Sequence, residues 1–403
     1  MADPPGTVDK PFDPVIAFGR NRGAGGYMMG AKGNSASVPR SYIRHLSAFL
    51  LFFLFLITAE ASYSGFYEKW GLKDGADRYS VPLMVDGTAT KPFVYRQLMP
   101  MTANVIEDAL PQGIKAKLLA RLVRPSPENP GRTNWGMRQG DADNPRYAIR
   151  YYIIYNLTFL AFFASLFLMR RLCLAEGLSP VAAVAAPVAF ALYLPFFLSR
   201  GGHFYDFTEL FFFIGAMCLC RTRLDWLLVP ISTIATYDKE LFFFFILCLA
   251  PLLVRDRKDI RGLAIFGGAL LVSGLTYVFN NAQYAGNPGE SVQFWLWGNL
   301  EYYVNPANLF WMERTYGLWG WSGYSLVAIL LVAAVARLGW GHLGTRMKLH
   351  ALLAAAINLP LFILFAHPGE VRSLNLLFPT LMLLIGGAVQ TSMRTQTGPA
   401  HGT

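Results

Sequence analysis

The sequence has few charged residues, and acidic side chains are the scarcer kind. Only 15% of the 403 residues are charged, with 25 acidic against 35 basic side chains, whereas a soluble domain usually carries about 25%. Hydrophobic residues make up 54%, and the mean hydropathy is +0.35. Apolar runs recur at about 20 residues, the length that crosses ~30 Å of hydrocarbon. The composition argues against an ordinary soluble domain and predicts a protein with many membrane spans.

Cysteines and the signatures of soluble cofactor enzymes are also scarce. The four cysteines form neither a metal-ligand spacing nor an evident disulfide frame. The chain contains no Gly-x-Gly-x-x-Gly, Walker or zinc-ligand pattern, and nothing in it supports a serine nucleophile. A secretory signal is not visible either, because the first apolar run begins near Leu46. We expect the Gly-rich residues 1–45 to form a disordered cytoplasmic tail.

What the sequence does contain is an alternation of two kinds of polar stretch between its apolar runs. One kind is rich in arginine and the other is a compact mixed cluster. The arginine stretches hold Arg170/Arg171, Arg221/Arg223, Arg255/Arg257/Lys258/Arg261 and Arg337/Arg346/Lys348. Short cytoplasmic loops are enriched in Lys and Arg, so the arginine stretches predict the cytoplasmic side and the mixed clusters the external side. The basic excess then reflects topology and attraction to anionic lipid, not nucleic-acid binding.

The apolar runs predict an all-α polytopic protein with about ten transmembrane helices in a single membrane domain, residues 46–390. The expected spans are 46–63, 148–169, 180–198, 207–220, 225–236, 241–254, 262–279, 324–336, 349–366 and 374–390. Both termini are then cytoplasmic, with residues 391–403 forming a second tail. Residues 225–254 allow two arrangements, one tilted helix or a hairpin of two short helices. Basic residues on both flanks favour the hairpin.

Two long external loops are expected, at residues 64–147 and 280–323. In the first loop apolar residues recur at three- and four-residue steps from Arg96 to Ala120, with a break at Pro111-Gln-Gly113. This pattern predicts two juxtamembrane helices at the membrane surface. The second loop is rich in Trp, Tyr and Phe, which favour the membrane–water boundary, and part of it is expected to form a further interfacial helix.

Four sets of ionisable residues are predicted to reach the external face. They are Asp86 with Arg96, His203/Asp206/Glu209, Asp238/Lys239/Glu240 and His367/Glu370/Arg372. Ionisable groups at membrane depth are costly to bury and are candidates for a functional site. Arginine can hold a phosphate with two hydrogen bonds, and a carboxylate can take the proton of an attacking hydroxyl. Together these residues suit the transfer of a group from a lipid phosphate.

Each residue also has a structural interpretation. Asp86 lies in a good turn sequence, and Arg96 can anchor an interfacial helix. Asp206 can cap a helix and Glu209 can complete a capping box. His203 and His367 can be ordinary loop histidines. Two neighbouring pairs can simply neutralise their own charges, Lys239/Glu240 and Glu370/Arg372.

The order of these motifs resembles that of bacterial GT-C-fold membrane glycosyltransferases. The resemblance is carried by Pro92-Phe-Val-Tyr95-Arg96-Gln-Leu98-Met-Pro100, Tyr205-Asp206, Asp238-Lys239-Glu240 and Gly369-Glu370-Val-Arg372. It implies a long first external loop with juxtamembrane helices, a polyprenyl-phosphate-linked sugar donor and inverting transfer to an acceptor hydroxyl. The family often has a paired acidic motif early in this loop. Here the loop has Asp74-Gly-Ala-Asp77 and a lone Asp86, which leaves the base and any divalent metal open.

We therefore predict a glycosyltransferase of the bacterial inner membrane that acts on its external face upon a lipid-linked or surface glycan acceptor. The candidate catalytic residues are Asp86, Asp206 and Glu240. The candidate substrate-binding residues are Arg96, His203, Lys239, Glu370 and Arg372, of which Arg96, Arg372 and Lys239 would hold the leaving phosphate. Two alternatives remain, a transporter or flippase for a lipid-linked oligosaccharide or small anion, and a glycan polymerase or ligase.

Overall fold

The computed structural model describes residues 40–396, except 126, 129–130, 134–135, 139 and 257. Packing divides the chain into Met1–Ala48 and Phe49–Thr403, and all contacts discussed below lie in the second unit. The predicted tail of residues 1–45 is corrected at its end, because the first helix begins at Arg40. The second tail is likewise helical as far as Gln396. The rest of both tails lies outside the described residues.

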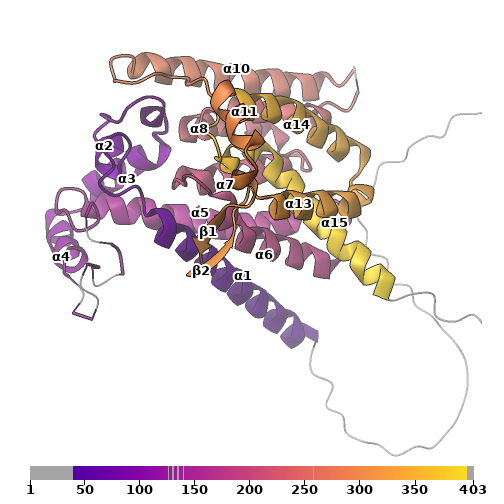
Figure 1. Cartoon of the computed structure of the whole chain (residues 1–403), viewed down its shortest axis with the longest axis horizontal. Helices are drawn as coiled ribbons and strands as arrows, with labels where there is room; N and C mark the ends of the chain where they lie inside the picture. Colours follow the sequence, from indigo (N-terminus) through magenta and orange to yellow (C-terminus); the bar gives the residue numbers. More distant parts are fainter. Residues whose placement is uncertain are drawn as a thin grey trace, which may run out of the picture. The chain divides into compact units, whose positions relative to one another are not determined.

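The described chain is mostly helical, as predicted, and a helix occupies each of the ten expected spans (Figure 1). These helices are α1 (Arg40–Trp70), α5 (Ala148–Ala175), α6 (Pro180–Phe197), α7 (Tyr205–Leu219), α8 (Leu228–Asp238), α9 (Phe242–Leu253), α10 (Ile260–Gln283), α13 (Leu326–Gly339), α14 (Thr345–Phe365) and α15 (Phe378–Gln396). The 3₁₀ segments are η1 (Phe93–Tyr95), η2 (Asp225–Leu227), η3 (Trp340–His342) and η4 (Val371–Leu377).

Six stretches within the described residues are long and apolar enough to cross a membrane. They are Ser47–Trp70, Ala148–Ala175, Pro180–Phe197, Ile260–Gln283, Thr345–Phe365 and Val371–Thr395. The helices α7, α8, α9 and α13 have only 15, 11, 12 and 14 residues. At about 1.5 Å per residue they fall short of ~30 Å of hydrocarbon. The structure therefore supports a membrane protein with six candidate spans and does not confirm the count of ten.

The arginine-rich stretches share one end of the helices. Arg221, just after α7, pairs with Glu176 at the end of α5. The start of α6 meets α15, where the Ser179 backbone donates to the Gln390 side chain over 2.7 Å. His342, after α13, lies 2.9 Å from Thr391 of α15. The mixed polar clusters lie at the opposite ends of the same helices, so the alternation in the sequence corresponds to two chemically different ends.

Helix α8 runs in the same direction as α10. Asp225, just before α8, pairs with Arg261 at the start of α10. Thr236, near the end of α8, lies 2.6 Å from Ser273, more than three turns along α10. The two helices therefore lie side by side with their starts together.

Helix α9 runs back along the same partner. Its end, Leu253, approaches Gly262 so closely that a Cβ at Gly262 would lie 2.5 Å from the Leu253 carbonyl oxygen. The Phe243 ring, near the start of α9, would lie 3.7 Å from a Cβ at Gly274. Residues 225–254 are therefore a hairpin and not one tilted helix, with Asp238, Lys239 and Glu240 at its tip. This confirms the favoured arrangement.

The first loop forms α2 (Val81–Val85), α3 (Leu98–Ala109) and α4 (Gln112–Leu122), which confirms the two predicted helices and their break. The second loop forms α11 (Leu296–Val304), α12 (Pro306–Leu309) and a β-hairpin that the sequence analysis missed, β1 (Met312–Thr315) and β2 (Leu318–Trp321). Tyr316 and Gly317 connect the strands with φ of 55° and 76°, as a two-residue type I′ turn requires. The Tyr316 hydroxyl donates to the Leu192 carbonyl over 2.9 Å, which ties the turn to α6.

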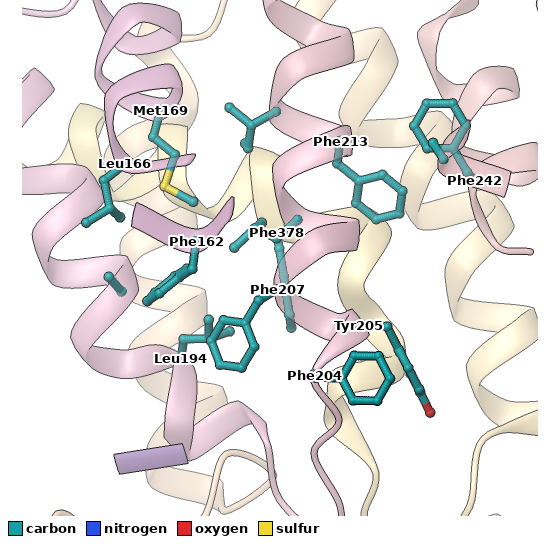
Figure 2. Close-up of a cluster of buried hydrophobic side chains, with 14 of the residues drawn as sticks. Phe162, Leu166, Met169, Leu194, Phe204, Tyr205, Phe207, Phe213, Phe242 and Phe378 are labelled. Atoms are coloured by element: carbon teal, nitrogen blue, oxygen red, sulfur yellow. The ribbon is translucent and has the colours of Figure 1, made fainter. Parts of the chain in front are cut away.

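The core beneath the polar end is built from aromatic rings that interlock between helices. The Phe207 ring of α7 lies edge-on to Phe66 of α1 and Phe162 of α5, at 4.9 Å between centroids in each case. Phe213 stacks on Phe245 of α9 at 4.1 Å. In Figure 2 the Tyr205 hydroxyl points away from the neighbouring rings. The α7 helix thus carries an apolar surface into the core and places its first turn at the polar end.

Candidate functional site

The first turn of α7 is stabilised by Asp206. Its carboxylate accepts the His203 backbone N–H over 2.9 Å, but Phe204 occupies the N-cap position of α7, so the interpretation of Asp206 as the N-cap is wrong. Negative charge at a helix N-terminus is favourable because the backbone N–H groups there point outward. The preceding Gly201 has φ of +148°, a conformation that favours glycine. This turn directs Asp206 toward the hairpin tip and η4.

Asp206 also joins two cations from distant parts of the chain. Arg372 donates to its two oxygens over 2.8 and 3.1 Å, and Lys239 donates to Oδ1 over 3.2 Å. The side chains of all three are less than a tenth exposed. With the His203 N–H, three donor groups occupy this carboxylate. Asp206 is therefore the residue that links α7, the hairpin and η4.

Glu209, one turn further along α7, binds the same lysine at a more buried position than Asp206 does. Lys239 Nζ donates to Glu209 Oε2 over 2.7 Å, and Asn375 Nδ2 donates to the same oxygen. The Glu209 side chain is 2% exposed and its other oxygen has no hydrogen-bond partner. These contacts do not form a capping box, so this interpretation of Glu209 is wrong. Its carboxylate instead neutralises the lysine at the hairpin tip.

Arg96 and Glu240 form the second branch of the network. Arg96 donates to both Glu240 oxygens, over 2.8 and 3.3 Å, and to the Tyr205 hydroxyl. The guanidinium also lies 4.5 Å from the centre of the Tyr205 ring, within the range of a cation–π interaction. Because Lys239 lies 5.5 Å from the same ring, Tyr205 connects the Arg96–Glu240 pair to the Lys239–Asp206 pair.

His203 supports this arrangement through its ring. The imidazole stacks on Tyr205 at 4.7 Å and lies 5.4 Å from both Tyr79 and Phe93. Burial, with a further contribution from Arg372, holds the pKa of His203 well below its ordinary value. A histidine in this state is neutral at physiological pH. The contacts show a packing residue that shapes the site and carries no charge at neutral pH.

Glu370 and Arg372 form the border of the network at the start of η4. Arg372 donates to Glu370 as well as to Asp206, so the pair is more than a simple boundary pair. Glu370 also accepts the His367 backbone N–H over 3.3 Å. The Ser199 hydroxyl donates to the Gly369 carbonyl over 2.8 Å. This bond ties the loop before α7 to the loop before η4.

Asp86 has separate partners. Its carboxylate accepts from Tyr147 over 2.6 Å and from Arg146 over 3.2 Å, at the start of α5. No described contact joins it to the network. Of the eight predicted site residues the structure therefore brings together Arg96, His203, Asp206, Lys239, Glu240, Glu370 and Arg372, and places Asp86 elsewhere.

Several residues of the site escaped the sequence analysis. Tyr205 and Asn375 hold charged side chains in place. Tyr205 entered the sequence analysis only as part of the Tyr205-Asp206 motif, and an isolated Asn gives no signal of such a role. Thr208 donates to Asp238 over 2.8 Å, which places Asp238 behind the network. Lys73 and Arg200, to which no role was assigned from the sequence, lie at its border.

The described contacts show no metal centre. No group of three or more His, Cys, Asp or Glu side chains in the described residues is arranged to hold an ion. Two surface hollows lie at the arginine-rich end, lined in part by Val335 and Ser392 and by Arg171 and Thr222. Neither adjoins the buried charges.

Comparison with known proteins gives no relative. No protein-family model matches the chain, and no curated protein or solved structure shows significant similarity to it. The resemblance to GT-C enzymes therefore stays a prediction from the sequence motifs.

Proposed function

We propose that the chain is a membrane glycosyltransferase, similar to GT-C enzymes, that uses a polyprenyl-phosphate-linked sugar. The observation that supports this best is the single network of buried charges built from α7, the α8–α9 hairpin and η4. Ionisable groups are expensive to bury in a membrane protein and usually serve function. The proposal places this end of the helices at the external face of a bacterial inner membrane, opposite the arginine-rich end.

In the proposed reaction the acceptor hydroxyl oxygen attacks the anomeric carbon of the donor sugar. The bond from that carbon to the phosphate oxygen breaks as the glycosidic bond forms on the opposite face of the sugar. The hydroxyl proton passes to a carboxylate of the protein. Polyprenyl phosphate leaves with the bonding electron pair, so the step needs no oxidant or further reactant.

Glu240 is the carboxylate best suited to accept that proton. Its side chain is 27% exposed, against 9% for Asp206, and Asp206 is already occupied by three donor groups. Burial opposes the charge of Glu240, but the Arg96 guanidinium outweighs it and holds the pKa of this carboxyl below its ordinary value. Glu240 is then ionised at neutral pH, as a group that accepts a proton must be.

A transporter or flippase is the second candidate. Transport sites are also built from short helices with buried charges at one terminus. Here the end of α8 and the start of α9 meet at such charges. The buried network of mixed charges lies at one end of the helices, whereas a carrier needs access from both faces. The two candidates differ in their product, because a carrier moves its substrate without changing a covalent bond.

The experiment that tests the proposal uses the purified full chain in liposomes with a panel of radiolabelled polyprenyl-phosphate sugars and a mixed lipid-linked glycan acceptor fraction. We expect label to move from the donor to a glycan product. Label that crosses the vesicle membrane while the donor stays intact would instead identify a carrier, and the glycosyltransferase would be rejected.

A further inference from the structure

The three buried cations of the network are already neutralised. Arg96 binds Glu240, Lys239 binds Asp206 and Glu209, and Arg372 binds Asp206 and Glu370. Three cations thus contact four carboxylates. A phosphate brought against this set would meet excess negative charge and would have to displace a buried carboxylate, which is costly. The cations expected from the sequence to hold the leaving phosphate are therefore engaged in holding the protein together.

Lys73 borders the network and forms no direct ion pair with a carboxylate of the described residues, although Asp206 and Glu370 act on its charge from a longer distance. Its ammonium lies 4.3 Å from the centre of the Trp70 ring. Trp70 in turn covers Gly202, where a Cβ would lie 2.8 Å from the indole. A Cβ at the neighbouring Gly201 would lie 3.8 Å from Nε of Arg372. The Lys73 ammonium also interacts electrostatically with Arg372 and Glu370, which places the lysine near this pair.

Arg200 borders the same pair from the loop before α7. Its exposed guanidinium donates to the Tyr302 hydroxyl over 3.1 Å and lies 5.8 Å from the Trp311 ring. A Cβ at Gly369, next to Glu370, would lie 2.9 Å from Arg200 Cγ. No carboxylate in the described part of the chain forms an ion pair with this arginine. Arg200 and Lys73 can therefore bind an added anion without breaking a direct ion pair.

The partners of Arg200 belong to an extended apolar surface. Residues 296–321 expose large apolar side chains by about half or more, among them Trp297, Val304, Phe310, Trp311, Leu318 and Trp319. Aromatic residues of this kind favour the boundary between acyl chains and headgroups. Trp311 contacts both Arg200 and this surface. A ligand that carries an anion and a long apolar chain fits the junction.

We propose that Lys73 and Arg200, and not the three buried cations, bind the phosphate of a lipid monophosphate whose chain lies along the exposed aromatic surface of residues 296–321. The identity of the ligand rests on the proposed function, whereas the location of the site rests on the contacts above.

The test measures binding of farnesyl phosphate to the purified full chain by calorimetry, with no sugar or acceptor present. We expect Lys73→Gln and Arg200→Gln each to weaken binding about tenfold, because each removes one charge-assisted contact. Lys348→Gln and Arg346→Gln, matched changes at the arginine-rich end, should have no effect. Lys73→Arg should bind like the native chain, which shows that loss of binding reflects charge and not misfolding.

Two results would overturn the proposal. One is unchanged binding in both Lys73→Gln and Arg200→Gln. The other is that inorganic phosphate binds as tightly as farnesyl phosphate, because the aromatic surface would then contribute nothing to the affinity. The proposed function fails separately. A chain that binds farnesyl phosphate through Lys73 and Arg200 but transfers no sugar would refute the glycosyltransferase and leave the lipid phosphate site in place.

Discussion

Asp206 and Glu240 are carboxylates of the same network, yet their surroundings suit them to different tasks. Asp206 accepts from a backbone N–H, a lysine and an arginine in a pocket that is nearly closed. Glu240 has one partner group, Arg96, and a side chain open enough for a substrate hydroxyl to approach. The first holds three segments together, and the second is placed to react.

The structural role of the Asp206 branch predicts a large stability effect. Arg372→Ala would leave Asp206 and Glu370 without their guanidinium partner in a buried site. Removing one member of a buried ion pair typically costs roughly 3–5 kcal/mol. Arg146→Ala removes an exposed pair with Asp86 and should cost less than about 1 kcal/mol. Reversible unfolding in detergent checks both, and equal effects would contradict the assignment.

Lys73 predicts a pH dependence for ligand binding. Burial, with a further contribution from Arg372, lowers the pKa of Lys73 to about 8, while Asp206 and Glu370 act in the opposite direction. The lysine is charged below this pH and neutral above it, whereas a phosphate monoester, with a second pKa of about 6, stays dianionic. Affinity for farnesyl phosphate should therefore fall between pH 7.5 and 9 in the native chain. It should stay constant over this range in Lys73→Arg, and a native profile without a fall would contradict the assignment.

The residue types of the site could be predicted because charges in an apolar sequence stand out. Seven of the eight predicted residues lie in one set of contacts. Which cations remain available to a ligand could not be predicted, because that depends on pairs formed by residues more than a hundred positions apart, such as Arg96 with Glu240. The separation of Asp86 was not visible either, because its partners Arg146 and Tyr147 lie 60 and 61 positions away in the sequence.

At the level of elements, the α8–α9 hairpin is the feature that brings Lys239 and Glu240 to the site. Its two legs are too short to cross a membrane, and both pack on α10. Basic residues on both flanks sufficed to favour a hairpin in the sequence. The β1–β2 hairpin was missed because its strands are only four residues long and read as part of an aromatic loop.

The hairpin can be tested by a designed disulfide. Thr236 and Ser273 face each other at 2.6 Å between hydroxyls, so cysteines at both positions should cross-link under mild oxidation. Thr236→Cys with Gly262→Cys is the matched negative pair, because Gly262 lies at the start of α10 beside Leu253. The four native cysteines are first replaced by alanine. A shift in electrophoretic mobility that reverses with reductant reports the bond, and efficient cross-linking of the negative pair would contradict the hairpin.

At the level of the whole molecule, the helices separate two kinds of polar chemistry. Arginine-rich stretches meet at one end and the mixed network at the other. The sequence predicted this division because positive charge is distributed unequally across membrane proteins. The predicted count of ten spans is not confirmed, because four of the ten helices have only 11 to 15 residues and are shorter than a membrane crossing requires.

The division predicts a labelling pattern. Single cysteines at Arg171 and Arg346 should react with a membrane-impermeant maleimide from the same side of sealed vesicles. Single cysteines at Gly75 and Asn305 should react only from the other side. Vesicles of both orientations supply the comparison, in a background that lacks the native cysteines. Labelling of Arg171→Cys and Asn305→Cys from one common side would contradict the arrangement.

The most direct test of the central claim is the rate of sugar transfer by Glu240→Gln protein, measured with the same labelled polyprenyl-phosphate donor as the native chain. Loss of a general base typically lowers the rate by about 10²–10⁴-fold. Glu176→Gln is the matched control, because Glu176 pairs with Arg221 at the arginine-rich end. We expect transfer to fall by at least about 100-fold in Glu240→Gln and to persist in Glu176→Gln. Native rates in folded Glu240→Gln protein would contradict the claim.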